Sequence, residues 1–110
     1  MEGMISFGNK RSYEDFKKQI PAQVLPLFDS IREFCFGLGE NVVEDVRMHR
    51  VVFCKSMTFR WFTDVEPQKD GVIIKIQKSR KDPVEIIQIN KDQQISEFGN
   101  LIKDAYEQIH

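Results

Sequence analysis

The sequence has few of the residues from which catalytic and metal sites are most often built. Its 110 residues include two cysteines and two histidines, and His110 is the last residue. The HExxH, CxxC, GxSxG, P-loop and GxGxxG patterns do not occur. His49 and Cys54 are five residues apart in an extended segment, so alternation points their side chains to opposite faces, which argues against a Cys–His pair. We therefore predict no catalytic residue, no bound metal and no cofactor.

Long apolar runs are also missing. No run approaches the roughly 18 residues that a membrane-spanning helix needs. The first residues, MEGMISFGNKRS, lack a basic region followed by an apolar block, so we expect no secretory signal and a cytoplasmic protein without a membrane partner. In that reducing compartment Cys35 and Cys54 are expected to be free, buried side chains, with a redox or metal pair as the alternative.

The net charge of −1 conceals an uneven distribution along the chain. Residues 46–82 carry nine basic and four acidic side chains, a net charge of +5, whereas residues 12–45 and 83–110 are acidic. Such asymmetry permits a basic face on an otherwise neutral protein. It is too weak by itself to identify a nucleic-acid-binding domain, which is usually far more basic.

Periodicity and capping residues predict three helices. Ser12 is an N-cap candidate with an acid three residues later, and the short helix it begins ends before Pro21. A second helix, over residues 24–38, is predicted because apolar residues recur at steps of three and four: Val24, Leu27, Phe28, Ile31, Cys35 and Leu38. A third helix near the C-terminus has the stripe Ile95, Phe98, Ile102, Ala105 and Ile109.

Between the second and third helices the apolar period changes to two, which indicates strands. We predict four of them, at residues 42–54, 59–65, 72–77 and 84–89. Their short connections favour antiparallel neighbours. The prediction is therefore one α+β domain over residues 1–110, with two N-terminal helices, a four-stranded antiparallel meander and a C-terminal helix on one sheet face. Residues 1–11 are expected to be a flexible or loosely attached segment.

The stretch Thr58-Phe59-Arg60-Trp61-Phe62-Thr63 contains the only tryptophan of the chain. Alternation assigns Phe59 and Trp61 to the core and Arg60 and Phe62 to the outer face. The predicted binding face lies there and comprises Arg60, Phe62, Lys75, Gln77, Lys78, Arg80 and Lys81. An aromatic ring among cations suits single-stranded nucleic acid or an acidic protein, although Asp64 and Glu66 on the same side repel phosphates. The alternative is a solvated face on which Phe62 is isolated or covered.

Two further charged groups have competing interpretations. Arg47, His49 and Arg50 form a second basic cluster, in which His49 is either a pH-sensitive cation or an ordinary surface residue. Carboxylates gather around Glu40 and Glu44, where they suit a hard cation, but their spacing matches no ion-binding loop. We interpret this acidic group as a solvated corner between a helix and a strand.

Several segments resemble a small α+β family of domains of unknown function whose members are sometimes called predicted transport proteins. The resemblance spans residues 12–108 and is carried by the second helix, by Val65-Glu66-Pro67-Gln68, by Val72-Ile73-Ile74-Lys75-Ile76, and by Leu101-Ile102-Lys103-Asp104-Ala105-Tyr106-Glu107. The resemblance implies a domain that occurs alone or appended to endonuclease-like proteins, and it supplies no catalytic residue. The family often has tyrosine and lysine where this chain reads Val51-Val52-Phe53-Cys54-Lys55, and only Lys55 is kept.

The leading functional prediction is a non-enzymatic binding or interaction module, with a protein or a nucleic acid as its partner. A homo-oligomeric protein-interaction domain that uses a sheet face or edge is the first alternative. A carrier of a small ligand or metal is the second.

Overall fold

The computed structural model describes residues 11–55 and 60–109, so most of the predicted N-terminal segment and Phe59 lie outside the described residues. These described residues form three α-helices, one short 3-10 helix and five strands. In order these are α1 (Tyr13–Phe16), η1 (Lys17–Gln19), α2 (Leu25–Gly37), β1 (Val42–Val46), β2 (Val51–Lys55), β3 (Arg60–Pro67), β4 (Gly71–Ile76), β5 (Glu85–Asn90) and α3 (Ile95–Gln108). The α+β class is confirmed.

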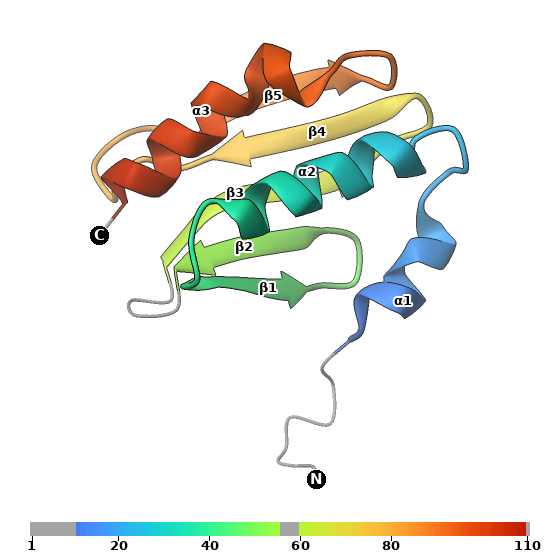
Figure 1. Ribbon diagram of the computed structural model, residues 1–110, viewed down its shortest axis with the longest axis horizontal. Coiled ribbons are helices and arrows are strands. Elements are labelled where there is room, and N and C mark those ends of the chain that lie inside the picture. Colours follow the sequence, from blue (N-terminus) through green and yellow to red (C-terminus); the bar gives the residue numbers. More distant parts are fainter. Residues whose placement is uncertain (1–10, 56–59, 110) are drawn as a thin grey trace, which may run out of the picture.

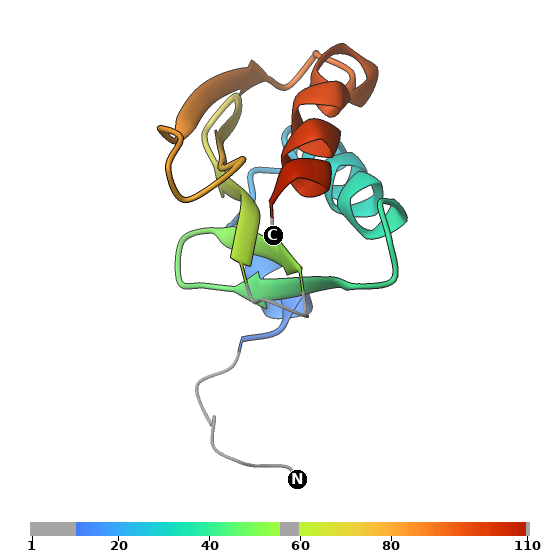
Figure 2. The same cartoon turned by 90° about the vertical axis from the view of Figure 1, so that its left-hand side faces the viewer.

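The five strands form one antiparallel sheet in the order β1-β2-β3-β4-β5, so each strand pairs with its neighbours in sequence. Helices α2 and α3 lie side by side and cover one face of this sheet (Figures 1 and 2). Two helices suffice for one face because each presents an apolar stripe. The opposite face, which we call the open face, carries no helix formed by residues 11–55 or 60–109.

The helices begin and bury side chains where the sequence predicts. The Ser12 side-chain oxygen accepts a hydrogen bond from the N–H of Asp15 at 3.1 Å, which confirms the cap of α1. At the other end of the chain, Gln94 and Glu97 form a reciprocal capping box that starts α3. Most residues of the predicted stripes are buried in the core, namely Val24, Leu27, Phe28, Ile31, Cys35, Phe98, Ile102, Ala105 and Ile109. None of the described helices is long and apolar enough to cross a membrane.

The prediction of four strands is wrong at the first of them. Residues 42–54 form two strands, β1 and β2, joined by a tight turn in which the N–H of Arg47 donates to the carbonyl of Arg50 at 2.8 Å. Met48 at the turn is 56% exposed. The turn sequence Arg-Met-His-Arg contains no glycine, proline, asparagine or aspartate, so it lacks the residues that usually mark a turn.

The predicted faces of β3 hold for Thr63 and Val65, which are buried, but are reversed for Trp61 and Phe62, because a β-bulge interrupts the pairing of β3 with β2. Phe53 pairs with Thr63, but the next residue, Cys54, pairs with Trp61 rather than Phe62. The extra residue in β3 reverses which face each side chain takes beyond that point. Phe62 and Thr63 are both fully buried. Trp61 instead shares the open face with Cys54.

Candidate functional site on the open sheet face

The strand register defines which side chains share the open face. Asp45 pairs with Val52, Val52 with Asp64, Asp64 with Lys75, and Lys75 with Ile86, so these five residues form one row across all five strands. Paired residues on one face of a sheet lie within side-chain contact distance. Within this row, Lys75 lies between the carboxylate of Asp64 and the exposed side chain of Ile86.

A shallow hollow of about 380 Å³ lies over this row, and we call it the Trp61 hollow. Four of its side chains are apolar, three are basic and one is acidic. They are Val52, Trp61, Val84, Ile86, Arg47, Arg50, Lys75 and Asp64. Ile86 is 67% exposed and Val84 is 40% exposed, which is unusual for aliphatic side chains in and beside a strand. The hollow therefore combines an aromatic ring, aliphatic walls and an excess of positive charge.

Asp64 is the acidic group of the hollow and is only 7% exposed. Burial raises the pKa of this carboxyl, while the charges of Arg50 and Lys75 act in the opposite direction. Arg50 Nε lies 2.9 Å from Asp64 Oδ2, yet this nitrogen makes no well-aligned hydrogen bond. The contact is thus a close ion pair that offsets the buried charge. Arg47 pairs with Asp45 at 2.8 Å at the edge of the sheet.

Residues from both predicted basic groups, the binding face and the second cluster, meet on the open face. Lys75 from the predicted binding face and Arg47 and Arg50 from the second cluster line the same hollow. His49 is exposed in the β1–β2 turn and is not part of its lining. The fully buried Phe62 corrects its predicted place on the outer face, because its ring packs against Tyr106 of α3 at a centroid distance of 5.2 Å.

The remaining members of the predicted face do not line the hollow. Arg60 pairs with Lys55, whose side chain contacts Tyr106 of α3, so the bulge turns Arg60 from the predicted outer face toward the helix face. Arg60 is the first residue of β3 and precedes Trp61. The connection from β4 to β5 starts beside β3, since the N–H of Gln77 donates to the carbonyl of Phe62 at 3.1 Å. That connection carries the other three basic residues, Lys78, Arg80 and Lys81, and it ends at Val84, which does line the hollow.

The side chains that make the hollow hydrophobic were not among the predicted site residues. Trp61 was assigned to the core because simple alternation contains no sign of the bulge. Val84 and Ile86 offered a signal, since the run Val-Glu-Ile-Ile-Gln-Ile has apolar side chains at both alternating positions. A strand with only one buried face leaves one of those sets exposed.

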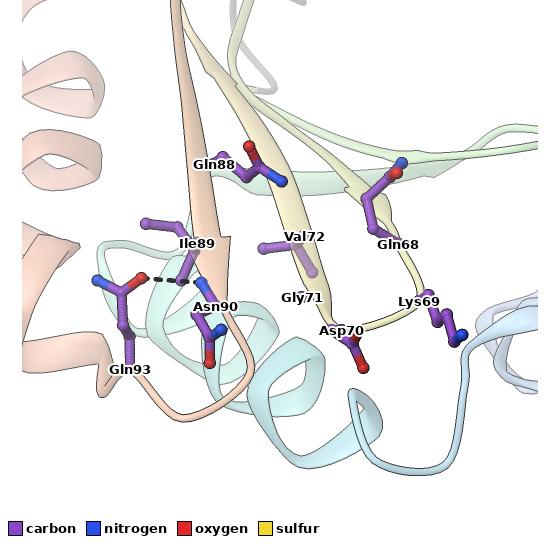
Figure 3. Close-up of a pocket in the computed structure, with 9 residues that line it drawn as sticks. All are labelled: Gln68, Lys69, Asp70, Gly71, Val72, Gln88, Ile89, Asn90 and Gln93. Atoms are coloured by element: carbon purple, nitrogen blue, oxygen red, sulfur yellow. Dashed lines mark hydrogen bonds between the residues drawn. The ribbon is translucent and has the colours of Figure 1, made fainter.

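A second hollow, of about 470 Å³, lies at the far end of β3, β4 and β5 (Figure 3). Four of its nine lining residues have amide side chains, namely Gln68, Gln88, Asn90 and Gln93. Several of these amides maintain local structure: Gln93 Oε1 accepts from the N–H of Asn90 at 2.8 Å (Figure 3), and Gln68 donates to Glu66 at 3.0 Å. The hollow has no aromatic ring in its lining, and its charges are one lysine and one aspartate. It is a weaker candidate than the Trp61 hollow.

The densest charged cluster outside the open face joins α1, α2 and β1. Tyr13 donates its hydroxyl to Asp29 at 2.5 Å, and the Arg32 guanidinium lies 4.0 Å from the centre of the Tyr13 ring. Arg32 also binds both carboxylate oxygens of Glu44. Burial, followed by the bond to Asp29, raises the pKa of Tyr13, and the bond to Glu44 raises the pKa of Arg32. Each of these side chains has its hydrogen-bond or ion-pair partner within the cluster. The cluster therefore stabilises the packing of α1, α2 and β1.

Neither the acidic group nor the cysteines form a metal site in the described part of the chain. Among residues 11–55 and 60–109, no three His, Cys, Asp or Glu side chains are placed to hold a metal ion. Cys35 and Cys54 are free and buried, as expected. Burial raises the pKa of both thiols, which keeps them protonated and poorly nucleophilic at neutral pH.

Comparison with curated proteins and with solved structures gave no match to this chain. One family model does match, and it covers residues 12–109. These limits agree with the residues over which the sequence resembles a small α+β family. The chain belongs to the DUF5655 family of domains of unknown function.

Proposed function

We propose that this chain is a non-enzymatic binding module that holds single-stranded nucleic acid on the open face of its sheet. One observation carries the proposal: the only tryptophan lies in a hollow that also presents Arg47, Arg50 and Lys75. An aromatic surface with cations beside it is the arrangement on which unpaired bases stack while their phosphates are neutralised. A duplex hides its base faces, so the hollow suits a single strand better.

The charge balance of the hollow supports an anionic ligand. Its lining has three basic side chains and one acid, and the acid, Asp64, is buried and already paired with Arg50. The nearby β4–β5 connection adds Lys78, Arg80 and Lys81. Asp45 and Glu66 lie on the same face and reduce the field, so we expect modest affinity.

The test is the fluorescence anisotropy of labelled oligonucleotides, single-stranded and duplex, at 50 and 200 mM salt. If three phosphates contact the protein, log K falls with log salt at a slope of about −2 for a single strand. A fourfold rise in salt should then weaken binding roughly 15-fold. Absent binding, salt-independent binding, or a preference for duplex contradicts the proposal.

Two variants and a matched control locate the site. Trp61→Ala should weaken binding roughly 5- to 160-fold, because stacking contributes about 1–3 kcal/mol per base. Lys75→Ala should reduce the salt slope by about 0.7, the contribution of one phosphate contact. Lys103→Ala is the control, since Lys103 is exposed on α3 on the other side of the sheet. Equal effects of the two lysine substitutions would place binding elsewhere.

A further inference from the structure

The strand β5 ends the sheet, and among the described residues its outer edge pairs with no other strand. An unpaired edge exposes N–H and C=O groups that can join another strand. The opposite edge, β1, carries two charged side chains, Glu44 and Asp45, which discourage such pairing. In β5 only Glu85 is charged, and the following residues read Ile-Ile-Gln-Ile-Asn.

The hydrogen-bonding pattern shows which backbone groups of β5 point outward. The N–H of Lys91, just after β5, donates to the carbonyl of Asp70 at 2.8 Å, and therefore points toward β4. Successive residues of a strand direct these groups to alternate sides. Ile86, Gln88 and Asn90 therefore direct their N–H and C=O groups away from β4. Gln93 occupies both groups of Asn90, because the Asn90 N–H donates to Gln93 Oε1 at 2.8 Å and the Asn90 carbonyl accepts from the Gln93 N–H at 3.0 Å. The outward groups of Ile86 and Gln88 are thus the ones that a second strand can meet directly.

Apolar side chains accompany this edge on both faces. Ile86 and Val84 are exposed on the open face, and Ile87 is half-buried on the helix face. Leu101 of α3 is 37% exposed. Gly99 of α3 faces Phe34 of α2, and Leu101, two residues later, lies about 200° further round the helix.

The flank of α3 that carries Leu101 is therefore turned away from α2 and toward the β5 side of the sheet. Among the described residues, five large hydrophobic side chains are exposed, and three of them lie on or beside this edge, namely Val84, Ile86 and Leu101.

The sequence of β5 is complementary to itself when two copies run antiparallel. If Gln88 lies opposite Gln88 of a second copy, Ile86 lies opposite Asn90 and Ile87 opposite Ile89. Gln88 then exchanges both backbone hydrogen bonds with Gln88 of the second copy. The bonds between Ile86 and Asn90 form only when Asn90 releases its two bonds to Gln93. In the same register Glu85 lies opposite Lys91, and this pair of opposite charges occurs twice.

We propose that two copies of this chain associate through β5, in the register centred on Gln88, to form one continuous ten-stranded sheet. The interface is isologous, as expected for a twofold dimer. The two Trp61 hollows then share one extended open face. This inference does not depend on the proposed function. It rests on the backbone of β5, on the exposed apolar side chains around it and on the charges of Glu85 and Lys91.

Sedimentation equilibrium of the full chain from 1 to 100 µM tests the association, and charge exchange tests its register. Glu85→Lys and Lys91→Glu each place like charges opposite one another twice, and each should raise the dimer dissociation constant roughly tenfold. The double variant Glu85→Lys/Lys91→Glu restores both attractions and should recover the original constant. A chain that stays monomeric throughout overturns the proposal. It is equally overturned if the single variants have no effect or the double variant does not recover.

A backbone substitution tests the edge independently of charge. Gln88→Pro removes an N–H that points away from β4, so it should abolish the dimer while the folded monomer persists, because proline is tolerated on edge strands. Gln88→Ala keeps the N–H and should still dimerise. If Gln88→Pro is folded and dimerises like Gln88→Ala, the edge is not the interface. If Gln88→Pro does not fold, the Glu85 and Lys91 variants test whether the β5 edge is the interface.

Discussion

The ring of Phe62 meets the ring of Tyr106 edge to face, with centroids 5.2 Å apart and planes inclined by 76°. This contact joins β3 to α3 across the core. Lys55 strengthens the same region, because its ammonium lies 4.5 Å from the centre of the Tyr106 ring and donates to the carbonyl of Ile109 at 2.8 Å. Phe62 therefore contributes to folding, whereas its neighbour Trp61 is available to a ligand.

The first prediction contrasts these two neighbours. Phe62→Ala should lower the free energy of unfolding by about 3–5 kcal/mol, because it removes a fully buried ring from a packed core. Trp61→Ala should cost less, about 1–2 kcal/mol, since that ring is only partly buried on the open face. Urea denaturation of both variants measures the difference. Equal losses, or a larger loss for Trp61→Ala, would contradict the bulge and the faces it sets.

The helices and the central strands could be predicted because each depends on a local pattern. Ser12 caps its helix through its own side chain, and the stripes of α2 and α3 follow the helical period. In β4 the residues Val72, Ile74 and Ile76 are all buried, as alternation predicts. These signals lie within one element, so no knowledge of its partners is needed.

The candidate site could not be predicted to the same extent, because it depends on relationships between strands. The bulge opposite Cys54 is a property of how β2 and β3 pair, and it reverses the faces of Trp61 and Phe62. The β1–β2 turn at Arg47 has no glycine or proline to mark it. Without these two features, Arg47 and Arg50 cannot be placed beside Trp61.

The second prediction concerns Asp64 and pH. Burial raises the pKa of this carboxyl above its ordinary value of 3.8, so between 3.8 and the raised value the folded chain binds more protons than the unfolded chain. Stability due to this group therefore falls as pH rises through that window. Asp64→Asn removes the titration, and its unfolding free energy should fall less than that of the wild type across the window. Parallel profiles from pH 3.5 to 7 would show that Asp64 is not perturbed.

The third prediction addresses the hydrogen bond between Tyr13 and Asp29. Tyr13→Phe should cost about 1.5–3 kcal/mol of stability, because the acceptor is a carboxylate and the donor is buried. A double-mutant cycle with Asp29→Asn isolates the interaction, and we expect a coupling of about 1 kcal/mol or more. Strict additivity of the two single substitutions would mean that the bond does not contribute to stability.

The fourth prediction compares two glycines. A side chain on Gly71 would place its Cβ 2.0 Å from the carbonyl oxygen of Ile89, a backbone atom that cannot easily move. Gly71→Ala should therefore destabilise the fold by about 1–3 kcal/mol. Gly37, at the end of α2, has nothing within 4 Å of an added Cβ, so Gly37→Ala should be neutral or stabilise by up to about 1 kcal/mol. Thermal unfolding of both variants checks the contrast, and an equal cost would contradict the β4–β5 spacing.

The intrinsic fluorescence of Trp61 tests directly whether the open face binds nucleic acid, because Trp61 is the only tryptophan in the chain. A single-stranded oligonucleotide should quench or shift its emission in proportion to binding measured by anisotropy, and it should protect the ring from acrylamide. Stacked bases cover the ring, which explains both effects. An oligonucleotide that binds by anisotropy while leaving the Trp61 emission and its acrylamide quenching unchanged would contradict the claim that the open face is the binding surface.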